Sequence, residues 1–275
     1  MCSIYVINIG ANTNHRSQAR SPIVNCNSFV FVSFCTERGE DNPTAYPKKM
    51  LPFINPHKQN LRTHNDPDWK NMTYGDICTG RGAALKHVNS NDILLFWGLL
   101  YHNECPDRRS CNDKKGACWE SFSLLLDENK GWYLLGAMRV EQVVEGGEKL
   151  EELSPELRCR VNRNAHCCNG KVPTNRRVFL GDEQHSRLFD KAVALWVPRS
   201  NSQDEWESSL MYKKLRSADG QCLSLNCSPR WSSSLRACRK MWDLDKPKER
   251  KLAERVRDAI QKYNKDFDLL KDARY

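Results

Sequence analysis

The sequence predicts an α+β protein, built as a single domain with a central mixed, curved sheet, long loops and a C-terminal amphipathic helix. Three observations support this fold class. Two β-rich runs stand near the amino terminus, two longer apolar runs resemble a buried strand pair, and the last segment has apolar residues at three-to-four spacing. Strands and helices segregated along the chain in this way are typical of an antiparallel or mixed sheet covered by helices.

The first two strands are expected at Ser3–Ile9 (SIYVINI) and Ser28–Phe34 (SFVFVSF). The segment between them is rich in Gly, Asn, Ser and Pro, so it should form a loop that leaves the carboxyl end of the first strand. Residues 37–76 contain several prolines and hardly any periodicity. They therefore predict a long ordered loop or an excursion over the surface.

The buried strand pair is expected at Asp92–Tyr101 (DILLFWGLLY) and Gly131–Val144 (GWYLLGAMRVEQVV). Both runs are dominated by large apolar side chains, as strands buried on both faces are. The segment that joins them is polar and contains cysteines, so we expect it to project as an elaborated hairpin loop.

Helices are expected at Glu148–Leu157, at Ser186–Trp196, and more weakly around Trp206–Leu215 in a serine-rich stretch. The strongest helix is expected over residues 247–270, with Pro247 near its start, where a missing N–H costs nothing. Its apolar side chains should pack on the sheet rather than on a partner. We expect a main domain over residues 1–197 and a mostly helical extension over residues 198–275 packed on the same core.

Composition limits the class of protein. The chain has 275 residues and a formal charge of +9, which favours an anionic partner such as a nucleic acid or a phosphorylated small molecule. Neither a secretory signal nor an apolar run of membrane-spanning length is visible, so we expect a cytoplasmic protein without a membrane partner. Protein partners are not indicated by the sequence.

The cysteines suggest thiols rather than a disulfide framework, since there are thirteen and the expected compartment is reducing. Cofactors are not indicated, although one loop contains four soft ligands that a structural zinc ion could use: His102, Cys105, Cys111 and Cys118. A second such group is Cys159, His166, Cys167 and Cys168. Because the tight CxxC spacing of zinc knuckles is missing, ordinary thiols are the preferred interpretation.

The stretch THNDPDWKNMTYGD, residues 63–76, holds an imidazole, carboxylates and a tyrosine hydroxyl in a segment without helical or strand periodicity. Pro67 restricts Asp66 and makes a rigid bend, and Gly75 allows a second bend. An imidazole beside carboxylates can act as a general acid or base. The alternative is that the carboxylates are turn or cap residues and His64 bonds a backbone carbonyl.

The chain also resembles a known family in several blocks, in order along the sequence: IYVINIGANTNHRSQARSP, THNDPDWKNMTYGD, NDILLFW with YLLGAMRV, NRNAH, and SRLFDKAV. Together they are similar to the nucleotide modification associated domain family of the third type. This resemblance implies a protein associated with making or processing modified nucleic-acid bases.

Motif residues of that family, together with the polar loop after the first strand, give the candidate site. The expected catalytic residues are His64, Asp66, Tyr74, Asp76 and His15. The expected substrate-binding residues are Asn8, Asn12, Arg20, Arg81, Asn162, His166, Ser186 and Arg187. In this hypothesis Arg20 and His166 hold a phosphate, and no metal is assigned to the site.

Two further patterns bear on function. The strand pair is similar to the core hairpin of PUA-like readers of modified bases, which implies an alternative, non-catalytic function with an aromatic cage made by Trp97, Trp132 and Tyr133. The other interpretation of these aromatic residues is core packing. The run 158–177 contains six Lys or Arg and no acid, which makes it the best candidate for contacting phosphates, with a solvated loop as the alternative.

Overall fold

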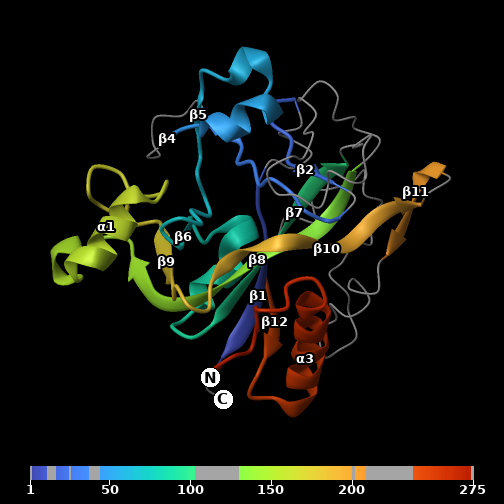
Figure 1. The fold of residues 1–275 in the computed structure, drawn as a ribbon. Coiled ribbons are helices and arrows are strands. Elements are labelled where there is room, and N and C mark those ends of the chain that lie inside the picture. The colour runs from blue at the N-terminus through green and yellow to red at the C-terminus, as the bar shows by residue number, and fades with distance from the viewer. Residues whose placement is uncertain are drawn as a thin grey trace.

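The computed structural model describes residues 2–10, 17–24, 26–36, 44–102, 130–199, 202–208 and 238–273. Its main feature is a mixed sheet in which six strands follow the order β11-β10-β8-β7-β1-β12 (Figure 1). These strands are β1 (Ser3–Asn8), β7 (Ile93–His102), β8 (Lys130–Glu145), β10 (Arg187–Arg199), β11 (Ser202–Ser208) and β12 (Arg239–Asp243). β1 is parallel to β7, and the other neighbours along this path are antiparallel.

The long strand β8 changes partner along its length. Its first part pairs with β7 as far as Arg139, and from Val140 onward it pairs with β9 (Arg177–Gly181). β9 pairs in turn with β6 (Thr73–Asp76), so the curved β8 ribbon leads from the main sheet to this strand pair (Figure 1). The predicted mixed α+β fold and the predicted strand pair are confirmed.

Shorter elements surround the sheet. β2 (Pro22–Ile23) runs parallel to the end of β7, and a small sheet contains β3 (Cys35–Thr36), β4 (Thr44–Ala45) and β5 (Arg62–Thr63). The 3-10 helices are η1 (Lys48–Phe53), η2 (Pro56–Lys58), η3 (Gly80–His87) and η5 (Leu150–Glu152). The α-helices are α1 (Pro155–Arg163) and α3 (Pro247–Gln261). The region predicted as a helix from Glu148 therefore contains η5 and the start of α1, whose first turn is capped by Ser154.

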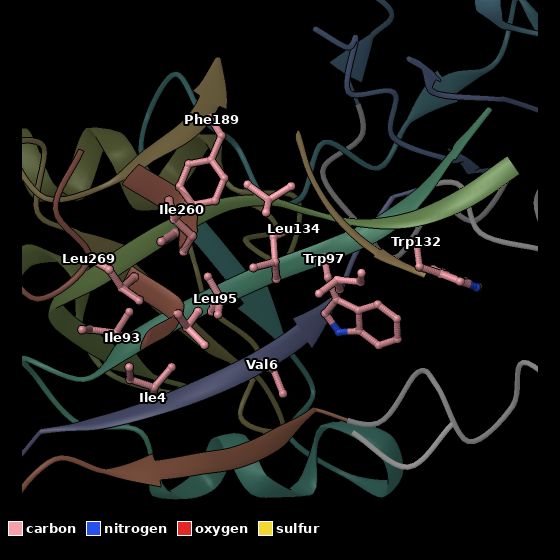
Figure 2. Close-up of a cluster of buried hydrophobic side chains, with 14 of the residues drawn as sticks. Ile4, Val6, Ile93, Leu95, Trp97, Trp132, Leu134, Phe189, Ile260 and Leu269 are labelled. Carbon is pink, nitrogen blue, oxygen red and sulfur yellow. The ribbon is translucent and has the colours of Figure 1, made fainter. Parts of the chain in front are cut away.

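Both faces of the main sheet are buried. Alternate side chains of β1 enter different cores, Ile4 and Val6 on one face and Tyr5 and Ile7 on the other. The first core also contains Ile260 of α3, which lies close to the sheet residues (Figure 2). The C-terminal helix packs on the sheet, as predicted, but α3 ends at Gln261, and residues 262–270 of the predicted helix are not helical.

Two predicted elements of the expected main domain, residues 1–197, are wrong. The segment predicted as a helix at Ser186–Trp196 forms strand β10, because the edge of β8 offers backbone hydrogen bonds to it. Its buried Phe189, Val193 and Leu195 join the same core as α3, and a register shift after Leu188 brings them into place. A free strand edge has overridden a helical spacing of apolar residues.

The predicted strand at Ser28–Phe34 is extended but is not part of a ladder. Only an isolated bridge joins Phe29 to Ile23, and the N–H of Val32 donates to the hydroxyl of Ser21 at 2.9 Å. A serine side chain thus replaces a neighbouring strand as hydrogen-bond partner.

In its described part, the carboxyl-terminal region contributes strands β11 and β12 to the sheet and one α-helix, α3. It is therefore less helical than expected. Trp206 lies in β11 rather than in a helix, while Leu210, Tyr212 and Leu215 lie outside the described residues. The boundary at residue 197 remains a prediction. None of the helices in the described ranges combines the length and apolar character needed to cross a membrane.

Candidate functional site

A small cavity of about 210 Å³ lies where β1, β6 and two loops meet. It is lined by Asn8, Ile9, Gly10, Phe34, His64, Asp66, Tyr74, Gly75, Asp76 and His166. Six of these residues were predicted from the sequence as site residues. They come from the end of β1, the stretch from His64 to β6, and the turn after α1.

Two histidines face each other in this cavity. His64 follows β5, and its ring stacks on Phe34 with the ring centroids 5.0 Å apart. His166 follows α1, and its ring meets that of His64 edge to face. The Nε2 atoms of the two rings are 3.2 Å apart. Residues far apart in the sequence are thereby brought into direct contact.

Asp66 completes the cluster. Its Oδ1 accepts hydrogen bonds from the backbone N–H of Gly75 at 2.9 Å and from Nδ2 of Asn164 at 3.2 Å. Its Oδ2 lies 3.4 Å from Nε2 of His166. The Asp66 side chain is only 4% exposed. The two donors hold Oδ1 in place, and Oδ2 is directed at His166.

Asn164 and Gly75 support this arrangement, and sequence reasoning missed both roles. Asn164 is fully buried, and its amide also accepts from the backbone N–H of His166 and donates to Thr73. A Cβ added at Gly75 would lie 2.4 Å from Cδ2 of His166, so glycine is needed for the close approach. The NRNAH motif could have indicated the role of Asn164, because this asparagine stands two residues before His166.

Tyr74 and Asp76 line another part of the cavity. The Tyr74 hydroxyl donates to Oδ2 of Asp76 at 3.1 Å, and the backbone N–H of Cys78 donates to Oδ1 at 2.6 Å. Burial raises the pKa of the Asp76 carboxyl above its usual range, and burial also raises the pKa of the Tyr74 hydroxyl. These two side chains form a hydrogen-bonded pair beside the histidines.

The other predicted site residues are not brought to the cavity in the described part of the chain. Arg20 lies with its guanidinium over the ring of Tyr101, and Arg187 pairs with Asp266 at 2.8 Å. Ser186 is buried, where its hydroxyl accepts from the backbone N–H of Arg139.

Arg81 and Asn162 are exposed and do not line the cavity. Asn8 does line it, with its amide donating to the carbonyl of Trp97 at 3.3 Å. Asn12 and His15 lie outside the described residues.

The predicted aromatic cage is part of the protein core. Trp97 and Trp132 are each 1% exposed, and their ring centroids are 5.3 Å apart. Tyr133 is 2% exposed and its hydroxyl lies 2.7 Å from Nε2 of His102. These positions give the three aromatic residues the packing role that was the alternative interpretation.

The basic run 158–177 is largely structural. Arg160 is buried and donates to the carbonyls of Asn71, Met72 and Gly181. Arg158 donates to carbonyls of the preceding turn, and Arg177 pairs with Glu145. These three guanidinium groups hold α1 and β9 in place, so the hypothesis that the run contacts phosphates is restricted to its other cations, such as the exposed Arg163.

A second, larger cavity of about 800 Å³ lies on the other side of the His64–Asp66 segment, since Asn65 lines it. Its wall includes the aromatic rings of Phe29, Phe31 and Trp69. Three cationic side chains also line it, Lys49, Lys70 and Arg163, together with the Asp68 carboxylate, which accepts hydrogen bonds from the backbone N–H of Lys70 and from Nδ2 of Asn71. An apolar cavity with aromatic walls and a few cations has the character of a site for an anionic aromatic ligand.

Among the described residues, His64, Asp66 and His166 form a group that could hold a metal ion, with their ligand atoms all within 4.8 Å of one another. The predicted zinc loop cannot be compared, because Cys105, Cys111 and Cys118 lie outside the described residues.

In the other predicted zinc group, His166 instead faces His64 and Asp66. No disulfide joins the described cysteines, in agreement with the expected thiols.

The comparison with protein families gives one result. The family model described as nucleotide modification associated domain 3 matches residues 3–250, which is most of the chain and extends past the predicted boundary at residue 197. No curated protein and no solved structure matches the chain.

Proposed function

The chain belongs to the nucleotide modification associated domain 3 family, and we propose that it is an enzyme that modifies a nucleotide or a nucleic-acid base. The observation that carries this proposal is the convergence of His64, Asp66 and His166 on one cavity. Buried imidazole and carboxylate groups that meet in a cavity are typical of catalytic sites, because burying them without a function is costly.

The contacts support roles that differ from the sequence hypothesis. His166 stands between the other two groups, 3.2 Å from His64 and 3.4 Å from Asp66, so it is part of the reacting cluster rather than a phosphate ligand. Asp66 orients His166, and the two imidazoles exchange protons with the substrate in the cavity. Tyr74 and Asp76 contribute further polar atoms to the same wall.

The larger cavity supports a nucleotide as substrate. Phe29, Phe31 and Trp69 provide faces on which a base can stack, and the three cations of its wall suit a phosphate. Asn65 lines this cavity, and its sequence neighbours His64 and Asp66 line the smaller one. The two cavities therefore share this short stretch of the chain, which supports the hypothesis that they act on the same ligand. Nucleotides and nucleic acids occur in the cytoplasm, which is the location expected from the sequence.

Mass spectrometry of nucleosides tests the function. Cells that produce the protein should contain a modified nucleoside, in DNA, RNA or the free nucleotide pool, that cells without it lack. His64→Ala and Asp66→Asn should each abolish this product, since each removes a member of the cluster.

His57→Ala is the matched control, because His57 is exposed and lines neither of the two cavities. It should leave the product unchanged, and a melting temperature close to that of the wild type should be seen for all three variants. A product that persists at full level in both His64→Ala and Asp66→Asn would contradict the proposed site.

A further inference from the structure

We propose that His64, Asp66 and His166 are the ligands of a divalent first-row transition-metal ion such as Zn²⁺ or Fe²⁺. Binding of the ion follows from the geometry of the cavity, whereas its use in a reaction rests on the function proposed above. The sequence hypothesis assigned no metal to these residues.

Two of the three spacings between the ligand atoms match those of a shared ion. Protein nitrogen and oxygen ligands lie about 2.0–2.2 Å from such a metal, which places neighbouring ligand atoms about 2.8–3.6 Å apart for octahedral or tetrahedral angles. The Nε2 atoms of His64 and His166 are 3.2 Å apart, and Nε2 of His166 is 3.4 Å from Oδ2 of Asp66. All three ligand atoms lie within 4.8 Å of one another, so a small movement that brings His64 and Asp66 closer completes the site when the ion binds.

The number of protons gives an independent argument. A neutral imidazole has one N–H, so Nε2 of His166 can donate either to His64 or to Asp66, but not to both. Nδ1 of His166 is buried without a hydrogen-bond partner among the described residues, so all polar contacts of this ring are made by Nε2. A cation between the three atoms satisfies all of them at once.

The surroundings of Asp66 match those of a carboxylate ligand. Gly75 and Asn164 donate to Oδ1 and hold the group in place, while Oδ2 remains directed at the cluster. Groups behind the ligands that fix their orientation are a regular feature of metal sites and tune the affinity of the metal.

The donor set selects the kind of ion. Two imidazoles and one carboxylate suit Zn²⁺, Fe²⁺ and their neighbours, whereas Mg²⁺ and Ca²⁺ prefer oxygen ligands alone. Three protein ligands beside a cavity of about 210 Å³ leave coordination positions for water or substrate, as catalytic metal sites do. A bound ion would occupy Nε2 of both histidines and lower the pKa of such a water, so that the hydroxide formed from it, rather than the imidazoles, would accept the proton of the substrate.

Co²⁺ alone, added to the reduced full-length chain without substrate, is the probe. Its visible absorption reports nitrogen and oxygen ligands, while thiolate ligands add strong near-ultraviolet charge-transfer bands, so the cysteines can be distinguished from this site. We expect one Co²⁺ per chain without the thiolate bands. His166→Gln and Asp66→Asn should weaken binding by more than about 100-fold, and Asn164→Ala by about 10-fold, since it acts behind a ligand.

His185→Gln is the matched control. His185 is also a partly buried histidine with carboxylates nearby, Asp182 at 2.8 Å and Asp272 at 3.1 Å, but it lies outside the cavity wall. This variant should bind Co²⁺ as the wild type does. Where a variant fails to fold, the NMR spectrum of the wild type decides: Zn²⁺ must shift the ring signals of His64 and His166 and leave those of His185 in place.

Wild-type protein that takes up no Co²⁺, or that binds it through thiolates only, would overturn the metal site. The same holds if His166→Gln and Asp66→Asn bind Co²⁺ normally. The two proposals fail separately: a modified nucleoside made without metal binding would leave the proposed function standing, and metal binding without any product would leave only the metal site.

Discussion

The cavity depends on a few residues that do not react themselves. Asn164 bonds Asp66, Thr73 and the backbone of His166, so one amide links the two segments that carry the cluster. Gly75 donates its N–H to Asp66 and has no side chain in the space that His166 occupies. The positions of the reactive groups are therefore set by backbone contacts and by one buried amide.

Replacing Gly75 with alanine should disable the site. The new Cβ would lie 2.4 Å from Cδ2 of His166 and 2.7 Å from Oδ1 of Asn164, so the imidazole has to move away from His64 and Asp66. We expect loss of the modified nucleoside and a destabilisation of about 1–3 kcal/mol from overpacking. Nucleoside mass spectrometry and urea unfolding measure the two effects.

Gly80→Ala is the comparison for this variant, because a Cβ at Gly80 meets no atom within 4 Å. Its positive φ of +51° costs some stability, but the site should stay active. If Gly75→Ala retained full activity, the close approach between β6 and His166 would have no bearing on the site.

At the level of single residues, the sequence predicted only part of the candidate site. His64, Asp66, Tyr74 and Asp76 were identified because they stand together in one short polar stretch. His166 was identified as a phosphate ligand, since nothing in a sequence shows which distant segment a histidine meets. The role of Gly75 depends on a neighbour ninety-one positions away, which no local pattern contains.

Among the elements, α1 shows how an apparently functional pattern can be structural. Its Arg160 is 7% exposed and donates to the backbone carbonyls of the turn before β6 and of the end of β9, and to Glu141 at 3.1 Å. The basic run 158–177 looked like a phosphate-binding segment because charge can be counted in a sequence and burial cannot. Arginines that bond buried carbonyls are unavailable to a ligand.

Arg160→Met tests this structural role. The substitution keeps much of the apolar stem but leaves carbonyl oxygens of Asn71, Met72 and Gly181 without this donor. We expect a loss of about 3 kcal/mol or more in the free energy of unfolding, measured by urea denaturation.

Arg163→Met on the same helix is the matched variant. Arg163 is exposed and makes a single hydrogen bond, to the side chain of Asn71 at 3.2 Å. Its loss should cost no more than about 1 kcal/mol. Equal destabilisation by the two variants would show that burial of Arg160 is unimportant.

The wrongly predicted elements have a common cause. Ser186–Trp196 has apolar residues at helical spacing, but the strand edge of β8 pairs with it, and Phe189, Val193 and Leu195 then enter the core beside α3. Ser28–Phe34 has strand-like residues, but its backbone is satisfied in part by Ser21. Local propensity decides only where no neighbouring backbone competes for the hydrogen bonds.

For the whole molecule, the sequence predicted the class of fold better than its connections. Apolar content identified β1, β7 and β8, and periodicity identified α3, because each of these elements is buried over most of its length or along one face. The division of β8 between two partners, and the insertion of β1 between β7 and β12, arise from pairings between distant segments. The cavity lies where these pairings meet, so it could not be placed before the fold was known.

The packing of α3 on the sheet gives a prediction for the stability of the entire domain. Ile260 is fully buried in the core that also contains Ile4 and Ile93, so Ile260→Ala leaves a cavity between helix and sheet (Figure 2). Such a truncation costs about 2–5 kcal/mol, through lost burial and incomplete collapse of the space. A decrease of this size in the free energy of unfolding should be measured by urea denaturation.

Tyr263→Ala provides the contrast just beyond the end of α3. Its side chain is 45% exposed, and the change should alter the free energy of unfolding by less than about 1 kcal/mol. Among the described residues, the hydrogen bonds that hold Asp66 and His166 come from Gly75 and Asn164 and not from α3, so Ile260→Ala should keep its Co²⁺ affinity at temperatures where it is folded. Parallel loss of stability and metal affinity would mean that α3 acts on the site through the sheet, and that the core and the cavity are not independent.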